Sequence, residues 1–149
     1  HVISRPGYEL LINSSIEKAH YFAELITQHE DFELITAPEL CLLTYRYNPA
    51  SVQALLANAD DAQQETINII LDKLTKFIQK RQRENGKSFV SRTRIEVKKY
   101  QGRKTLVFRV VLANPLTSKT ILQDVLTEQM QLALESETFL PKLLSMSKP

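Results

Sequence analysis

The sequence predicts one α+β domain in which a small, mainly antiparallel sheet packs against helices on one side. Its 149 residues are the length of a single ordinary domain. Apolar residues switch between helical spacing and strand alternation in the order helix, strand, strand, helix, strand, strand, helix. Strands that follow one another in pairs favour an antiparallel sheet. A composition of 43% hydrophobic and 24% charged residues, with three glycines, excludes collagen-like and largely disordered chains.

The N-terminal part is predicted to be one long helix followed by two strands. Apolar residues recur at helical spacing after Arg5-Pro6-Gly7, which predicts a helix over residues 6–30. Two apolar segments that suit strands, residues 32–36 and 40–47, are separated by Ala37-Pro38-Glu39. The helical stripe consists of Leu11, Ile12, Ser15, Ile16, Ala19, Phe22, Ala23 and Ile26.

A second long helix is predicted over residues 60–84. Residues 48–61 connect it to the preceding strand, and Asn85-Gly86 is a typical helix stop. Basic side chains gather in its last turns, where they complement the helix dipole. The predicted buried face is formed by Ile67, Ile70, Leu71, Leu74, Phe77 and Ile78.

A hairpin is predicted to follow this helix. Residues 89–98 alternate with period two, which indicates a half-buried strand with one polar face. Gln101-Gly102-Arg103 is predicted to turn the chain into a second strand over residues 105–113.

The C-terminal part is predicted to hold one helix and a tail. Asn114-Pro115-Leu116-Thr117 ends the last strand, and Thr117 is expected to be the N-cap of a helix over residues 118–134. No clear period is present in residues 135–149. Residues 1–149 are therefore interpreted as one domain with a leading helix (6–30), an α+β body (31–134) and a tail (135–149).

Basic residues are concentrated in one stretch of the chain. Twelve of the nineteen lysines and arginines lie between Lys73 and Lys104, together with only two acids, Glu84 and Glu96. The net charge is therefore +10 in this stretch and −8 in the remainder, which holds seven basic and fifteen acidic residues. Such asymmetry raises the possibility of a nucleic-acid partner, whereas a simpler interpretation is the solvent-facing side of one helix and one strand.

The common signatures of catalytic and cofactor sites are absent from the sequence. It contains neither of the glycine-rich phosphate-binding motifs, and no Ser-His-Asp arrangement is evident. His1, His20 and His29 lack the spacing of metal ligands, so no metal site is predicted. Cys41 is expected to be a small core residue in an apolar strand.

Further observations bear on the location and completeness of the chain. One cysteine cannot form an internal disulfide, which fits a reducing cytoplasm. No apolar run reaches the roughly 18–20 residues that cross a bilayer, so no membrane partner is expected. The chain begins at His1 without an initiator methionine or a signal pattern. We interpret it as a piece of a longer protein that is not a complete enzyme by itself.

Arg109 breaks the pattern of an otherwise apolar strand. Its neighbours on the same face are Val107 and Val111, so alternation places a guanidinium among valines. A buried cation is costly unless an anion meets it, and a planar guanidinium on a rigid strand suits bidentate binding of a carboxylate. The alternative is an arginine that reaches solvent or pairs with a structural acid.

Four segments of the sequence match motifs that occur together in one enzyme family. Arg109 to Thr117 reads R-x-x-x-x-N-P-x-T, and Phe89 to Thr93 reads F-x-S-x-T. The other two segments are Arg5 to Glu9 and Glu39 to Tyr47. In their order along the chain they resemble the C-terminal domain of group II pyridoxal-phosphate-dependent amino-acid decarboxylases, the family of glutamate, pyridoxal-type aspartate 1- and 2,4-diaminobutyrate decarboxylases. There, Arg5 to Glu9 is similar to the start of the helix after the large domain, and Glu39 to Tyr47 is similar to the first small-domain strand. The resemblance spans about Arg5 to Leu134.

The resemblance implies that the cofactor and the substrate carboxylate are bound by different domains. The cofactor, pyridoxal 5'-phosphate, would be bound by the large domain of a fold-type I enzyme, whose histidine, aspartate and lysine motifs this chain lacks. Arg109 would grip the substrate carboxylate, with Ser91 and Thr93 as active-site neighbours. The parent would be a cytoplasmic homodimer acting on an acidic amino acid, aspartate or glutamate, with 2,4-diaminobutyrate as the next candidate. No catalytic residue is expected in this chain, which alone should be inactive.

Two other functions stay open at this point. One is a small nucleic-acid-binding domain that uses the basic stretch from Lys73 to Lys104, although exposed aromatic residues for base stacking are missing from its strand, apart from Tyr100 in the turn. The other is a regulatory module that binds a free amino acid through Arg109. The resemblance favours the decarboxylase, with an amino-acid substrate and no nucleic-acid or membrane partner.

Overall fold

Four strands form a single antiparallel sheet in the order β1-β2-β4-β3. The computed structural model describes residues 5–86, 90–114 and 116–147, with the backbone alone for residues 5–12. The predicted α+β class is confirmed. The strands are β1 (Phe32–Glu39), β2 (Leu42–Tyr47), β3 (Val90–Val97) and β4 (Arg103–Val111).

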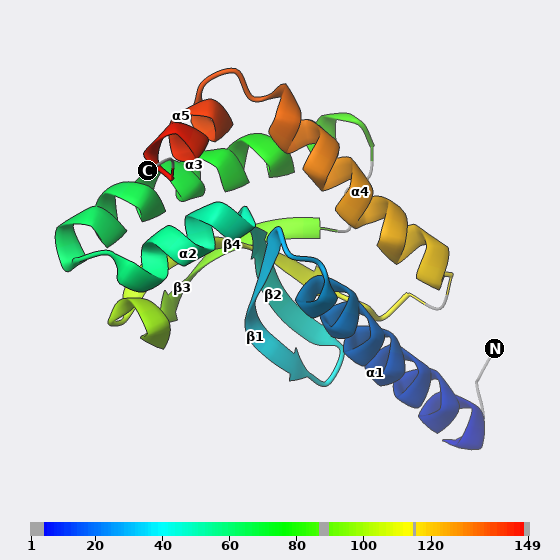
Figure 1. Cartoon of the computed structure of the whole chain (residues 1–149). Helices are drawn as coiled ribbons and strands as arrows, with labels where there is room; N and C mark the ends of the chain where they lie inside the picture. The colour runs from blue at the N-terminus through cyan, green and yellow to red at the C-terminus, as the bar shows by residue number, and fades with distance from the viewer. Residues whose placement is uncertain (1–4, 87–89, 115, 148–149) are drawn as a thin grey trace.

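Helices lie against one face of this sheet (Figure 1). The long helices α1, α3 and α4 make this layer, and α5 packs on α3. The helices are α1 (Arg5–Gln28), α2 (Ala50–Asn58), α3 (Asp61–Glu84), α4 (Lys119–Glu135) and α5 (Phe139–Met146), with a short 3-10 helix η1 (Lys98–Tyr100) between β3 and β4. Within the described residues, no helix combines the length and the apolar character needed to cross a membrane.

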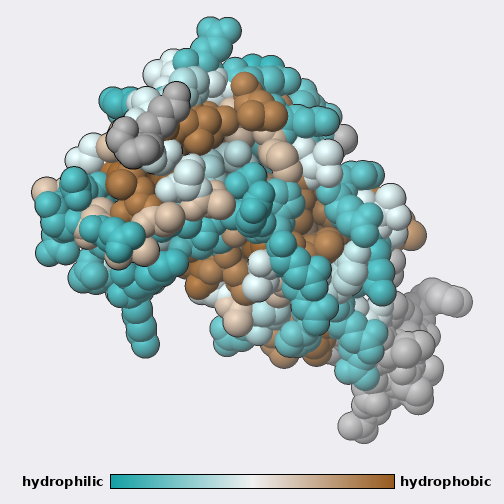
Figure 2. Space-filling model, viewed as in Figure 1, coloured by the Kyte–Doolittle hydropathy of each residue, from teal (hydrophilic) through white to brown (hydrophobic). Residues whose placement is uncertain are grey.

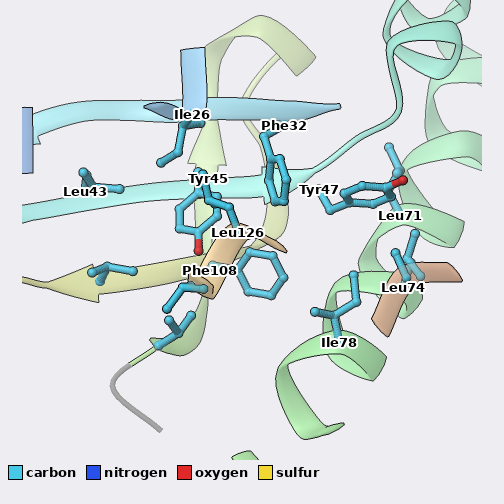
Figure 3. Close-up of a cluster of buried hydrophobic side chains, with 14 of the residues drawn as sticks. Ile26, Phe32, Leu43, Tyr45, Tyr47, Leu71, Leu74, Ile78, Phe108 and Leu126 are labelled. Carbon is cyan, nitrogen blue, oxygen red and sulfur yellow. The ribbon is translucent and has the colours of Figure 1, made fainter. Parts of the chain in front are cut away.

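Aromatic side chains hold the helical layer to the sheet. Tyr45 of β2 and Phe108 of β4 are register partners, with ring centroids 5.2 Å apart, and Phe22 of α1 meets Tyr45 edge-on at 5.3 Å. The Tyr45 hydroxyl donates a hydrogen bond of 2.7 Å to Gln129 of α4, which satisfies a polar group inside the core. Figure 3 shows Tyr45 and Phe108 in the core, together with Ile26, Phe32, Leu43, Tyr47, Leu71, Leu74, Ile78 and Leu126.

The predicted helix over residues 60–84 is confirmed as α3. Asp60 is its N-cap and forms a capping box with Gln63, in which each side chain accepts from the other residue's backbone N–H. The helix ends at Asn85, and Gly86 follows with φ +80°, a conformation that glycine adopts without strain. Phe77, expected on the buried face, is half-buried and pairs with Phe139 of α5 at 6.5 Å.

The first hairpin differs from its prediction because Ala37-Pro38-Glu39 does not interrupt the strand. Two register shifts between Leu34 and Glu39 accommodate the proline, and β1 is an edge strand, which tolerates a missing backbone donor. The turn falls instead at Leu40, which has φ +54°. Cys41, predicted to be a core residue of a strand, is half-buried and lies in this turn.

Two helices were missed by the sequence prediction. The connection at residues 48–61 contains α2, whose buried side chains are Val52 and Leu56, and the tail contains α5, which buries Leu140 and Leu143. Both helices are short, at nine and eight residues, so an apolar period has too few turns to stand out.

Smaller corrections concern the ends of β3, β4 and α4. Ser118, not Thr117, caps α4, and its hydroxyl accepts from the N–H of Ile121, while Thr117 is buried. The predicted turn at residues 101–103 is longer, because η1 precedes it and Gln101 adopts φ +55°. Phe89 and Pro115, which contribute to the family resemblance, lie outside the described residues.

Candidate functional site

Arg109 lies in a row of polar side chains that crosses the sheet. Its Cα partners are Thr44 of β2 and Ser91 of β3, and Thr44 is in turn paired with Thr36 of β1. Residues directly opposite one another in antiparallel strands point to the same face. One guanidinium and three hydroxyls therefore form a row across all four strands, which we call the arginine row (Thr36, Thr44, Arg109 and Ser91).

The arginine row lies on the sheet face opposite the helices. Phe108 and Val110 point into the helix-covered core, so alternation turns Arg109 away from it. The Arg109 side chain is exposed, and its face-mate Val111 is 42% exposed, whereas Val107 is fully buried. The expectation that both valines enclose the guanidinium is therefore wrong. Strand β4 is apolar on both sides, but its outer face opens to solvent at this end.

The hydroxyls of the row are bonded within the sheet, while the guanidinium is not. The hydroxyl oxygens of Thr36 and Thr44 lie 2.7 Å apart, and Ser91 Oγ donates to the carbonyl oxygen of Arg109 at 3.3 Å. Within the described part of the chain, no side-chain hydrogen bond or ion pair of Arg109 is present. The row therefore presents a positively charged donor whose capacity is unused by the fold.

The structure places the two predicted neighbours of Arg109 at different distances along the sheet. Ser91 is its direct partner, whereas Thr93 is half-buried and pairs with Val107, one step further along the same face. Thr36 and Thr44 were missed because strand register decides which residues meet, and register cannot be read from one sequence. The available signal was Thr44, a polar residue in a strand whose other residues, apart from Arg46, are apolar or aromatic.

Exposed apolar side chains lie next to the arginine row. Val111 pairs with Leu42, and the adjoining turn presents Leu40, which is 72% exposed in a left-handed conformation unusual for leucine. On the side of the molecule seen in Figure 1 and Figure 2, too, apolar residues come to the surface between polar ones. Apolar surface beside an unused charge is typical of a region that another part of a protein covers.

A second arginine, Arg46, is the cation that the fold buries. It is fully buried, and its Nε donates to Glu33 at 2.6 Å while its two terminal nitrogens donate to Asn68 at 3.0 Å and to the Tyr100 hydroxyl at 2.8 Å. Glu33 also accepts from Tyr100 at 2.7 Å and from Lys99 at 2.8 Å. We call these five residues the Arg46 cluster.

The Arg46 cluster is electrostatically satisfied. Burial alone raises the pKa of Glu33, but the charge of Arg46 and the hydrogen bonds from Lys99, Tyr100 and Arg46 outweigh it and lower this pKa to about 2. Burial raises the pKa of the Tyr100 hydroxyl. Each ionised group meets a counter-charge within the cluster, which joins β1, β2, α3 and η1.

The described residues do not form a pyridoxal-phosphate site. A Schiff base needs a lysine that is deprotonated near neutral pH, usually by burial, and every described lysine is exposed or half-exposed. Among the same residues, no group of three or more histidine, cysteine or acidic side chains could hold a metal ion. His29 instead accepts from the N–H of Asp31 at 3.2 Å and packs edge-on against Phe32.

Comparison of the sequence with known proteins gives one informative relative. The chain is 68% identical over 143 residues to the aspartate 1-decarboxylase of Aliivibrio fischeri. The match covers 96% of this chain and 26% of the relative, so the chain spans about a quarter of that protein's length. No family model matches the chain.

Several solved structures share the fold of this chain. Mouse CSAD matches 86% of this chain with a TM-score of 0.69 and 23% identity, over 24% of its own length. The glutamate decarboxylase domain of a Vibrio parahaemolyticus diaminobutyrate-pyruvate transaminase and L-2,4-diaminobutyrate decarboxylase matches 85% of the chain (TM-score 0.61, 18% identity, 22% of its length). Oryza sativa TDC, solved with PLP and tryptamine, matches 84% (TM-score 0.59, 18% identity, 23% of its length).

Proposed function

We propose that this chain is the C-terminal part of a pyridoxal-phosphate-dependent amino-acid decarboxylase, in which Arg109 binds a carboxylate of the substrate. The observation that carries the proposal is the exposed guanidinium of Arg109, which no described acid neutralises, in a chain 68% identical to an aspartate 1-decarboxylase. The shared fold with decarboxylase structures supports it.

The arginine row suits recognition of a carboxylate. A guanidinium offers two parallel N–H donors to the two oxygens of a carboxylate, and the strand backbone fixes the root of the side chain. The hydroxyls of Thr44 and Ser91 flank it on neighbouring strands. Because these hydroxyls are hydrogen-bonded within the sheet, they define the position of the row and leave the guanidinium as the free donor.

The cofactor would be bound outside this chain. Pyridoxal phosphate supplies an electron sink for the electrons that remain when carbon dioxide leaves. Since no described lysine is buried, the Schiff-base lysine and the phosphate contacts belong, in this proposal, to a large domain that precedes the chain. The exposed apolar residues Leu40 and Val111 beside the row would be covered by that domain.

Aspartate is the substrate that we favour, since the relative is an aspartate 1-decarboxylase. Glutamate and 2,4-diaminobutyrate are the next candidates. We further propose that the parent is a homodimer and that it is cytoplasmic, which fits the single free thiol of Cys41.

The competing nucleic-acid function loses support in the structure. Tyr100, which follows the basic strand, is 4% exposed and hydrogen-bonded to Arg46 and Glu33, so it cannot stack on a base. Phe77, the other aromatic residue of the basic stretch that the structure describes, is half-buried against Phe139. Among the described residues, the basic stretch therefore has no fully exposed aromatic ring.

A graft tests the proposal. The segment of the Aliivibrio fischeri enzyme that aligns with this chain would be replaced by the chain, and release of carbon dioxide from aspartate, glutamate and 2,4-diaminobutyrate would be measured with pyridoxal phosphate. We expect activity on aspartate within about tenfold of the unaltered enzyme, because the two segments are 68% identical.

Two controls make the graft decisive. The unaltered enzyme sets the reference rate, and the enzyme lacking the segment sets the background. A graft that folds, dimerises and binds the cofactor but releases no carbon dioxide above background contradicts the proposal.

A further inference from the structure

A hollow of about 350 Å³ lies between helix α3 and strands β3 and β4, away from the arginine row. Its lining includes four cations from three separate elements and two aliphatic side chains. We call it the basic hollow; the cations are Lys73 and Lys76 of α3, Arg94 of β3 and Arg103 of β4, and the aliphatic residues are Ile69 and Leu106.

A buried carboxylate fixes the two arginines of the basic hollow. Asp72 Oδ2 accepts from Arg103 Nη1 at 3.0 Å and from Arg94 Nη1 at 3.3 Å. Its other oxygen accepts from the backbone N–H of Leu106 at 3.1 Å, and the residue is 7% exposed. Because Asp72 is anchored to the sheet, it holds the mostly buried guanidinium of Arg103 in place and gives the more exposed Arg94 an acceptor before any ligand arrives.

The positive charge of the basic hollow exceeds its internal neutralisation. Asp72 and Glu65, which accepts from Arg103 Nε at 2.6 Å, supply two negative charges against four positive ones. The ammonium groups of Lys73 and Lys76 have no ion pair or hydrogen bond within the described ranges. A surplus of two positive charges is left on one wall.

We propose that the basic hollow binds a phosphate monoester of a small organic molecule. A phosphate monoester carries a charge of about −1.5 to −2 at neutral pH, which matches the surplus, and its three oxygens can meet cations from several directions. The exposed aliphatic side chain of Ile69 gives the organic part a surface to lie on. The proposal goes beyond the decarboxylase function and does not depend on it.

Binding of phenyl phosphate to this chain tests the proposal. Amide and side-chain NMR shifts would be followed at low salt, since screening weakens exposed charge interactions. We expect saturable one-to-one binding centred on Lys73, Lys76 and Arg94, tighter than that of inorganic phosphate. The double variant Lys73→Gln and Lys76→Gln should weaken it at least about tenfold.

A matched control removes the same charge from the same basic stretch. Lys98→Gln with Lys104→Gln alters two exposed lysines outside the hollow and should change the affinity less than about twofold. All four lysines are exposed, so both double variants should keep the thermal midpoint of the parent chain.

Three results with phosphate ligands would overturn the proposal. The first is NMR shifts that never saturate with phenyl phosphate. The second is a loss of affinity in the control double variant equal to that in Lys73→Gln with Lys76→Gln, and the third is equal affinity for phenyl phosphate and inorganic phosphate. Tighter binding of duplex DNA or RNA through Lys73 and Lys76 would also overturn it and would assign the surface to nucleic acid.

Discussion

Arg46 and Arg109 are both strand arginines, yet the fold treats them in opposite ways. Arg46 is fully buried and donates to Glu33, Asn68 and Tyr100. Arg109, on the adjacent strand β4, is exposed and has no side-chain partner among the described residues. A charge that the domain neutralises, such as that of Arg46, supports the fold. A charge that it leaves without a partner, such as that of Arg109, is available to a ligand.

The comparison predicts the largest effect on stability at Arg46. Arg46→Met leaves the Glu33 carboxylate buried without its main counter-charge and should lower the free energy of unfolding by about 3–5 kcal/mol. Arg109→Met removes an exposed side chain without a bonded partner and should change it by no more than about 0.5 kcal/mol. Urea denaturation of both variants measures the two values. Equal losses would contradict the distinction between the two arginines.

The pH dependence of stability tests whether the buried Arg46 cluster stabilises the fold. Because the pKa of Glu33 falls from 4.5 to about 2 on folding, its ionised form stabilises the fold above pH 4.5 and this contribution is lost as the pH drops toward 2. A shift of this size corresponds to about 3 kcal/mol. Unfolding free energies measured between pH 7 and pH 2.5 should show the loss in the parent chain and a shallower slope in Glu33→Gln.

An exposed acid provides the control for this measurement. Glu135 pairs with Arg81 at 3.3 Å with both side chains about half exposed, so Glu135→Gln should leave the pH profile close to that of the parent. A Glu33→Gln profile identical to the parent's would show that Glu33 is not the responsible group.

Removal of a single hydroxyl from the Arg46 cluster should cost more stability than removal of one from the arginine row, although the difference should be smaller than that between the two arginine variants. Tyr100→Phe deletes a buried group that accepts from Arg46 and donates to Glu33, and should cost about 1–3 kcal/mol. Thr36→Val deletes an exposed hydroxyl of the arginine row and should cost less than about 1 kcal/mol. Thermal unfolding of the two variants checks the order, and a reversed order would contradict it.

The smallest expected effect is the formation of a Schiff base between this chain and pyridoxal phosphate. With no buried lysine among the described residues, mixing should give no stoichiometric aldimine absorbance band that survives dialysis. Absorbance spectra before and after dialysis measure this. A persistent band traced to one lysine by borohydride reduction would contradict the assignment of the cofactor site to another domain.

Sequence patterns predicted the longest elements well and the short ones badly. Helix α3 has a repeated apolar stripe, an Asp60 cap and a Gly86 stop, and each signal is local. Helices α2 and α5 are stable because Val52 and Leu143, among others, are buried against distant elements. Pro38 inside β1 is allowed by the edge position of that strand, which only the assembled sheet defines.

The candidate site was predicted in part. Alternation identified Arg109 as an anomaly, but it could not say which end of β4 is open, so the expected burial was wrong. The buried cation is Arg46, whose partners Glu33 and Tyr100 lie 13 and 54 residues away in the sequence. No local pattern joins such residues. A charge at a strand position is therefore informative only once its partners are known.

The most direct test of the central claim is the kinetics of Arg109→Lys in the grafted decarboxylase. Lysine keeps the charge but loses the paired donors, so kcat/KM for aspartate should fall at least about 100-fold while cofactor binding and the thermal midpoint stay unchanged. Arg83→Lys, at an exposed position on α3, is the matched control and should keep full activity. Full activity in Arg109→Lys would contradict the claim that this arginine binds the substrate.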